Sequence, residues 1–328
     1  MLNAQLRLSE SIFGKPEEKA TRDGFGTALL ELGERDPRVV VLCADLAEST
    51  RALAFKEKYP KRYIELGVAE QNLATVGSGL ANYGKIPFIA SYAAFSPGRN
   101  NEQIRTTISL NNVPVKIAGM HAGVSVGPDG ATHQALEDIA LMRVQPNMVV
   151  IYPCDAEEAR KAVLAAAAYP GPVYLRFARE KTPLMTTRET PFTLGKANVM
   201  WRSENPQVAI LATGALLYQA LRAAQDLERE HIAAVVANIH TIKPLDKETV
   251  VSLARETGAV VTVEEHQAAG GFGGAIAECL SQEHPVPIEF IGVKDRFGQS
   301  GEPPELYHEY GLDAQAIAAA AKKVVSRK

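Results

Sequence analysis

The sequence is poor in cysteine and has no long apolar run. Its three cysteines, Cys43, Cys154 and Cys279, are far apart and form no Cys-x-x-Cys pair. This argues against a disulfide framework or a zinc site and favours reduced, buried thiols. No window is apolar enough for a membrane span, and the N-terminal residues include several glutamates instead of a signal-peptide core. We therefore expect a cytoplasmic protein with no membrane partner.

A strong charge of one sign is also missing. The 35 lysines and arginines nearly balance the 38 aspartates and glutamates, for a formal net charge of −3. Such a balance gives no reason to expect a nucleic acid partner. The 328 residues, 46% of them hydrophobic and 22% charged, suit a globular chain of about two domains.

Strand-like apolar runs alternate with helical patterns along the whole chain. This alternation predicts an α/β fold with a doubly wound, mainly parallel sheet that has helices on both faces. The expected strands are residues 39–43, 87–91, 113–118, 148–152 and 173–177, followed by 208–212, 233–237, 259–263 and 288–292.

The chain divides in the middle. Residues 182–206 contain several prolines and glycines with weak periodicity, as expected of a linker between domains. The glycine-rich segment 270–274 suits either an anion site at a helix N-terminus or tight packing, and we favour packing and subunit contact. The predicted divisions are an N-terminal extension (1–20), a first domain (21–185), a linker (186–205) and a smaller α/β domain (206–328).

Glu70 opens a segment of small and apolar residues, 68–80, that has the pattern of a helix. A carboxylate in such surroundings is desolvated and needs a polar partner. The commoner explanation for a glutamate here is capping of the first helical turn. A functional role for Glu70 is favoured instead by the polar and aromatic residues that follow the predicted strands, which are described next.

Polar residues also gather where predicted strands end. His121, Asp129 and His133 follow the strand that ends near residue 118, and parallel sheets commonly bind ligands at this edge. Their irregular spacing is unlike a metal-binding His-x-x-x-His pair, so we favour hydrogen bonding to a polar substrate. Tyr92 and Phe95 follow another strand end, where their rings can stack on a flat heterocycle.

Four segments together resemble the pyrimidine-binding domain of transketolase, a thiamine-diphosphate-dependent enzyme: 65–72, 91–105, 127–134 and 174–177. Segments 238–246 and 270–274 resemble its C-terminal domain. The resemblance spans nearly the whole chain, and within the family it is strongest to the C-terminal subunit of a split, two-chain transketolase. 1-Deoxy-xylulose-5-phosphate synthases and the β subunits of 2-oxo acid dehydrogenases share this architecture.

The resemblance implies cofactors that this chain alone does not hold. Thiamine diphosphate requires Mg²⁺ and a diphosphate cradle, which the family supplies with a Gly-Asp-Gly motif that is missing here. The metal therefore has no ligands in this chain. We expect a partner, the N-terminal transketolase subunit with the diphosphate-binding domain, in an α2β2 heterotetramer.

The resemblance also assigns roles at the cofactor. Glu70 would hydrogen-bond the aminopyrimidine ring, while Tyr92 and Phe95 would pack on its face. His133 would lie near the aminopyrimidine and the substrate carbonyl. Asn101 stands near the position where many relatives have an aromatic residue, and it would either hydrogen-bond the pyrimidine or leave the cofactor looser.

Further roles concern the substrate. Asp129 would bind a substrate hydroxyl next to the cleaved bond. The residues that match the family's contacts to the substrate phosphate are Arg22, Ser49, His121 and Arg176. Guanidinium groups suit a sugar phosphate better than a neutral sugar.

The sequence thus predicts a transketolase subunit of the pentose phosphate pathway. It would transfer a two-carbon ketol unit between ketose and aldose phosphates, and only together with its partner. The alternatives are a subunit similar to 1-deoxy-xylulose-5-phosphate synthase or to a 2-oxo acid dehydrogenase β chain, and a regulatory subunit without catalytic activity.

Overall fold

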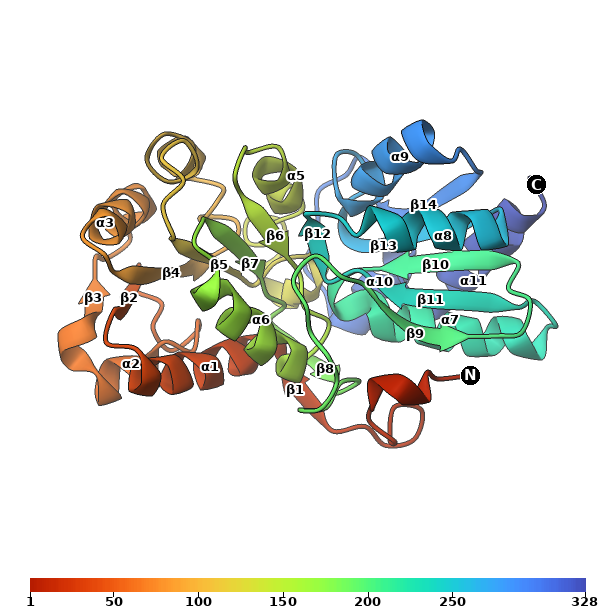
Figure 1. Ribbon diagram of the computed structural model, residues 1–328, viewed down its shortest axis with the longest axis horizontal. Helices are drawn as coiled ribbons and strands as arrows, with labels where there is room; N and C mark the ends of the chain where they lie inside the picture. Colours follow the sequence, from red (N-terminus) through yellow and green to blue (C-terminus); the bar gives the residue numbers. More distant parts are fainter.

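The computed structural model describes all residues from 1 to 328 and contains two large β-sheets that lie side by side (Figure 1). The larger sheet has the strand order β12-β6-β7-β5-β4-β2-β3, and all its pairs are parallel except β12 with β6. Its strands are β2 (Val39–Cys43), β3 (Tyr63–Glu65), β4 (Ile86–Tyr92), β5 (Lys116–Met120), β6 (Val149–Ile151), β7 (Val173–Arg176) and β12 (Thr241–Lys243).

Helices cover both faces of the larger sheet, because alternate strand residues are apolar on both sides. Val41 belongs to the core under α1, α2 and α6, whereas the next residue, Leu42, belongs to the core under α3 and α5. The helices are α1 (Thr21–Arg35), α2 (Leu53–Lys58), α3 (Glu70–Asn82), α4 (Asn101–Gln103), α5 (Asp138–Arg143) and α6 (Ala156–Ala168). Short helical turns are η1 (Ala4–Leu6), η2 (Pro60–Arg62), η3 (Ile104–Ser109) and η4 (Val124–Asp129).

The second sheet has the order β14-β13-β10-β11-β9, and only β9 is antiparallel to its neighbour. Its strands are β9 (Asn198–Arg202), β10 (Val208–Ala212), β11 (Ala234–Asn238), β13 (Val260–Gln267) and β14 (Ile288–Val293). Around it lie η5 (Gly214–Leu216), α7 (Leu217–Arg229), α8 (Lys247–Thr257), α9 (Phe272–Glu283), α10 (Pro303–Glu309) and α11 (Ala314–Val325). The predicted α/β class with a mainly parallel first sheet and a smaller second sheet is confirmed.

The two sheets share a core, and one strand from the second half of the chain joins the larger sheet. One cluster of 32 buried residues includes Ile139 beside the first sheet and Ile276 beside the second. Strand β12 comes from the second half of the chain yet completes the larger sheet. Strand β9 lies within residues 186–205, so this segment, which we expected to be only a linker, contributes an edge strand to the second sheet.

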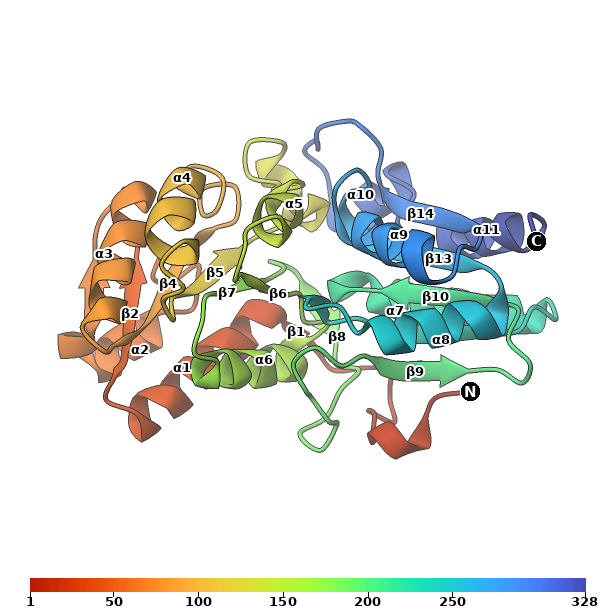
Figure 2. The same cartoon turned by 45° about the horizontal axis from the view of Figure 1, so that its top comes forward.

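The N-terminal segment packs beside β9 (Figure 2). The amide of Asn3 donates a hydrogen bond to the carbonyl of Met200 at 2.9 Å, and the ring of Phe13 meets Trp201 edge-on at 5.9 Å. Strand β1 (Glu18–Ala20) then pairs with β8 (Lys181–Pro183). No helix has both the length and the apolar composition needed to cross a lipid bilayer.

Candidate active site

The residues selected from the sequence meet at one edge of the larger sheet. Strands β7, β5, β4 and β2 are parallel neighbours, so their carboxyl ends lie side by side. Tyr92 is the last residue of β4, and the loops that follow β7, β5 and β2 carry Arg179, His121 and Ser49 respectively. This is the edge at which open α/β sheets bind ligands.

Glu70 is the first residue of α3, and its side chain is buried. Ser91 Oγ donates a hydrogen bond to Oε1 at 3.1 Å, and Arg99 Nη1 donates to Oε2 at 2.5 Å. Asn100 Nδ2 donates to the Glu70 carbonyl oxygen at 2.9 Å, which fixes the start of the helix. The carboxylate is thus compensated by a guanidinium and a hydroxyl, as burial of a charge requires.

Aromatic rings lie next to this carboxylate. The rings of Tyr92 and Phe95 are nearly parallel, with centroids 5.9 Å apart. The Arg99 guanidinium lies 4.7 Å from the centroid of Phe95, and the ring of His133 meets Phe95 edge-on at 5.5 Å. The structure therefore brings Glu70, both predicted aromatic residues and His133 to one place.

His121 is buried between an aromatic ring and a cation. Its imidazole stacks on Tyr92 with centroids 4.1 Å apart, and Nε2 lies 2.9 Å from Arg22 Nη1. Burial, followed by the charge of Arg22, lowers the pKa of His121 to about 3, so the ring is neutral. Because arginine can only donate, Nε2 is the acceptor and Nδ1 carries the hydrogen. This Nδ1 is buried and has no partner in the chain.

A group of arginines lies beside His121. Arg22 Nη1 also donates to the Ser49 carbonyl oxygen at 2.9 Å. Burial and the nearby charges of Arg51 and Arg179 lower the pKa of Arg22. Arg179 Nη1 donates to the Val126 carbonyl at 2.6 Å. Arg51 and Arg179 have carboxylate neighbours, whereas Arg22 forms no ion pair, so its charge favours an anionic ligand.

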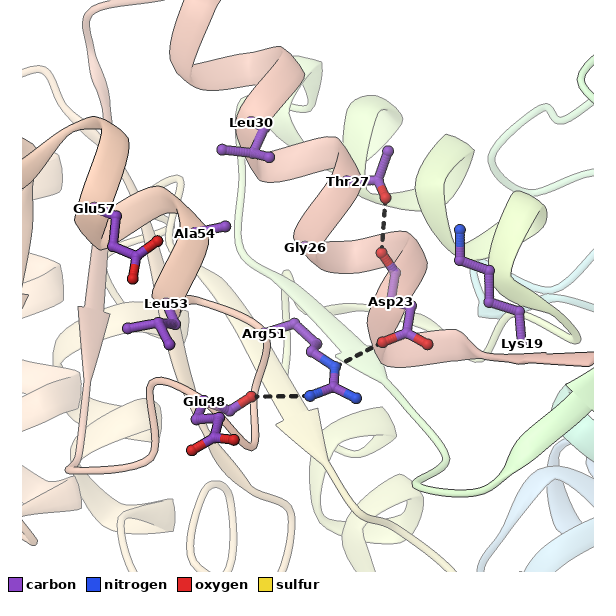
Figure 3. A pocket seen from close by; sticks show the side chains of 10 residues that line it. All are labelled: Lys19, Asp23, Gly26, Thr27, Leu30, Glu48, Arg51, Leu53, Ala54 and Glu57. Carbon is purple, nitrogen blue, oxygen red and sulfur yellow. Dashed lines mark hydrogen bonds and ion pairs between the residues drawn. The ribbon is translucent and has the colours of Figure 1, made fainter.

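Arg51 is fixed from the outer side of this group, next to a surface groove of about 360 Å³ between α1 and α2 (Figure 3). Its Nε donates to Asp23 Oδ1 at 2.6 Å, and its Nη1 lies 3.4 Å from the Glu48 carbonyl oxygen. The ion pair between Arg51 and Asp23 attaches the loop after β2 to α1. It thereby holds Ser49 opposite Arg22.

Arg176 does not join these arginines, and our expectation for this residue needs correction. Its side chain is fully buried at the end of β7. Nε donates to Asp138 Oδ2 at 2.8 Å, and Nη2 donates to the carbonyls of Ala135 and Glu265 at 3.2 and 2.9 Å. An internal ion pair therefore occupies Arg176, which has no exposed surface for a substrate phosphate. Arg179, which sequence analysis missed, stands at the site instead.

Asp129 and His133 lie on the loop that follows β5. Asp129 ends η4, and its Oδ1 is 3.7 Å from Arg179 Nη1. His133 Nδ1 is 2.9 Å from Thr132 Oγ1. Asn101 begins α4, where its Nδ2 is buried without a hydrogen-bond partner. Asp129 thus borders the group of arginines, and His133 borders the aromatic rings.

The pyrimidine half of thiamine diphosphate fits these residues. A carboxylate has about four acceptor positions, of which Ser91 and Arg99 use two of those on Glu70. The Tyr92 and Phe95 rings supply an apolar face for a flat heterocycle. In the chain, no group of three or more His, Cys, Asp and Glu side chains is arranged to hold a metal ion.

Comparison with known proteins agrees with this geometry. The family model of the transketolase pyrimidine-binding domain matches residues 17–185, and that of the transketolase C-terminal domain matches residues 195–317.

Similar proteins include subunits of split enzymes. The 6-deoxy-6-sulfo-D-fructose transketolase subunit of Clostridium sp. strain MSTE9 is 40% identical over 96% of this chain and 97% of its own length. One of the subunits of the apulose-4-phosphate transketolase of Phocaeicola vulgatus is 37% identical over 94% of this chain and 98% of its own. A solved structure described as a split-gene transketolase in an inactive β4 tetramer is 46% identical, covers 94% of this chain and 98% of its own, and superimposes with a TM-score of 0.87.

Proposed function

Because the chain belongs to the transketolase family, we propose that it is the subunit of a two-chain transketolase that supplies the pyrimidine-binding and C-terminal domains. The reaction is transfer of a two-carbon ketol unit from a ketose phosphate to an aldose phosphate, as in the pentose phosphate pathway. The observation that carries this proposal is the buried Glu70 carboxylate beside the Tyr92 and Phe95 rings.

Thiamine diphosphate, when bound, supplies the electron sink that allows a carbon–carbon bond beside a carbonyl to break. Glu70 holds a proton at the pyrimidine ring nitrogen, and its dry surroundings strengthen that hydrogen bond. Phe95 and Tyr92 would pack on the ring and orient it, and His133, which meets Phe95 edge-on, would lie nearby. Asn101 Nδ2, which has no partner in the chain, is available to the pyrimidine.

The cationic end of the site orients the substrate. Arg22 and Arg179 bind its anionic group, together with the Ser49 hydroxyl. Neutral His121 donates its Nδ1 hydrogen to a substrate oxygen, because Arg22 already occupies Nε2. Asp129 accepts a hydrogen bond from a substrate hydroxyl. Two relatives are named for a sulfonated and a phosphorylated sugar, and both sugars end in a tetrahedral anion.

A partner chain completes the site. It brings the diphosphate-binding domain and the Mg²⁺ ligands, for which this chain has no suitable cluster. We propose an α2β2 assembly. A related chain is described as an inactive β4 tetramer, which supports the expectation that this chain alone is also inactive. The three free, buried cysteines support a reducing, cytoplasmic location.

Donor specificity tests the proposal. We would mix the chain with its diphosphate-binding partner, thiamine diphosphate and Mg²⁺, and offer either xylulose 5-phosphate or pyruvate, each with an aldose phosphate acceptor. Turnover of xylulose 5-phosphate is the expected result. Turnover of pyruvate alone would replace transketolase chemistry with that of 1-deoxy-xylulose-5-phosphate synthase or a 2-oxo acid dehydrogenase. Inactivity with both donors would favour a regulatory subunit.

A further inference from the structure

Two neighbouring buried glutamates in β13 make contacts with different domains. Glu264 Oε2 and Oε1 accept hydrogen bonds from the amides of Phe272 and Gly273 at 2.6 and 2.8 Å, which caps α9 within the C-terminal domain. Glu265 points the other way, as alternation along a strand requires. Its Oε1 accepts a hydrogen bond from the Ser125 amide of the pyrimidine-binding domain at 2.6 Å.

The surroundings of Glu265 leave its carboxylate little freedom. Tyr152 and Tyr307 each donate a hydroxyl hydrogen to Oε2 at 3.4 Å. On the other side, a Cβ placed on Gly123 would lie 2.3 Å from Oε1, and the φ of this residue is 90°. Only glycine allows this backbone to approach the carboxylate so closely. The loop and the carboxylate are therefore fitted to each other.

Ser125 belongs to η4, the segment that ends at Asp129. A second attachment closes the same loop, because Gln134 Nε2 donates to the carbonyls of Val124 and Gly127 at 3.0 and 3.2 Å. The same Nε2 donates to the carbonyl of Gln299 in the C-terminal domain at 3.0 Å. Both ends of the loop that bears Asp129 and His133 are thus tied to the C-terminal domain.

We propose that Glu265 is a positioning residue through which the C-terminal domain fixes the 123–134 loop, and with it Asp129 and His133, for catalysis. This role rests on the proposed function of the site. The carboxylate is fully buried and acts through the Ser125 amide. Glu264 is just as buried, but it caps only α9. If Glu265 had a merely structural role, replacing either glutamate would have the same effect on the loop.

Hydrogen exchange of the isolated chain tests the contact without any cofactor. Glu265→Ala should speed amide exchange in residues 123–134 by about tenfold or more, because the Ser125 amide loses its buried acceptor. Glu265→Gln keeps an oxygen acceptor for Ser125 and should exchange like the wild type. Glu264→Ala, the matched control, should speed exchange in the first turn of α9 and leave the loop unchanged.

Kinetics of the reconstituted complex test the consequence. Glu265→Ala should lower kcat by about tenfold or more with little change in the KM of thiamine diphosphate, and Glu265→Gln should restore most of it. Wild-type kcat in Glu265→Ala would overturn the proposal, as would equal loop exchange in Glu264→Ala and Glu265→Ala.

If Glu265→Ala does not fold, Tyr307→Phe is the second variant. It removes one donor to Glu265 Oε2 and should produce a smaller increase in loop exchange; unchanged exchange would overturn the proposal.

An inactive wild-type complex would count against the proposed function only. The exchange comparison between Glu264→Ala and Glu265→Ala would still decide whether Glu265 holds the loop.

Discussion

Arg99 joins Glu70 to Phe95. One guanidinium nitrogen donates a hydrogen bond to the Glu70 carboxylate at 2.5 Å, and the same guanidinium lies 4.7 Å from the centroid of the Phe95 ring. The Glu70 side chain is fully buried, whereas 46% of the Arg99 side chain is exposed. The two groups assigned to the cofactor pyrimidine are therefore set relative to each other before any partner chain binds.

Glu70→Gln should lower turnover of the reconstituted complex by about 10²- to 10⁴-fold, the range for loss of a proton-holding group. The amide keeps the size of the side chain but cannot hold the proton at the pyrimidine nitrogen. Steady-state kinetics measure the loss, and circular dichroism confirms folding. Glu102→Gln, which changes an exposed glutamate on α4, is the control and should keep full activity. Wild-type turnover in Glu70→Gln would disprove the role.

Arg99→Met should raise the KM for thiamine diphosphate and lower the free energy of unfolding by about 1 to 2 kcal/mol, since the buried Glu70 loses a charged donor that is itself half exposed. Cofactor titration and urea denaturation measure the two effects. Arg105→Met is the matched control, because Arg105 is exposed and forms no ion pair. Equal effects of the two substitutions would contradict this account of Arg99.

Arg179→Ala should raise the KM of a phosphorylated donor at least tenfold. It should have little effect on a donor without a phosphate, such as hydroxypyruvate, because in our proposal Arg179 binds only the anionic end of the substrate. Comparing the two donors in the same complex makes the measurement independent of the amount of folded enzyme. A similar change in KM for both donors would mean that Arg179 does not recognise the anion.

Arg176→Ala should act on stability. The substitution leaves the buried Asp138 carboxylate without its cation, a loss that typically costs about 3 to 5 kcal/mol. The free energy of unfolding from urea titration gives the value. If the Arg176→Ala protein has wild-type stability and has lost only its affinity for phosphate, Arg176 binds the substrate and this account of it is wrong.

Lys116 gives a prediction of pH dependence. Its buried Nζ donates to the carbonyls of Tyr169 and Gly171, each at 2.7 Å, and burial lowers its pKa from 10.5 to about 7. Between these values the unfolded chain binds the proton more strongly, so this group's contribution to stability rises with pH and is lost as pH falls towards 7.

The free energy of unfolding, measured from pH 7 to 9, should therefore rise relative to that of Lys116→Met by up to about 1.4 kcal/mol per pH unit. Subtracting the variant at each pH removes the contribution of other titrating groups. A difference that stays constant across this range would contradict the lowered pKa.

The sequence predicted the buried strands well because their apolar runs are continuous, as in β2 and β10. It missed β9, since this edge strand is short and lies among prolines and glycines that indicate a linker. It predicted Glu70, Tyr92 and His121 as neighbours because each follows or faces the carboxyl end of a parallel strand.

The choice between Arg176 and Arg179 needed the structure. Both arginines stand near the end of one strand, and the sequence does not reveal which side chain enters the interior and which reaches the sheet edge. Arg176 is the buried one, because it forms an ion pair with the buried Asp138. Glu265 was likewise hidden, since its contact with Ser125 joins residues 140 positions apart.

The most direct test of the central claim, that this chain supplies half of an active site, is a titration. The diphosphate-binding chain would be added to a fixed amount of this chain, with thiamine diphosphate, Mg²⁺, xylulose 5-phosphate and ribose 5-phosphate, while turnover is followed. We expect no turnover without the partner and saturation at about one partner per chain. Turnover by this chain alone, or no turnover at any ratio, would contradict the account.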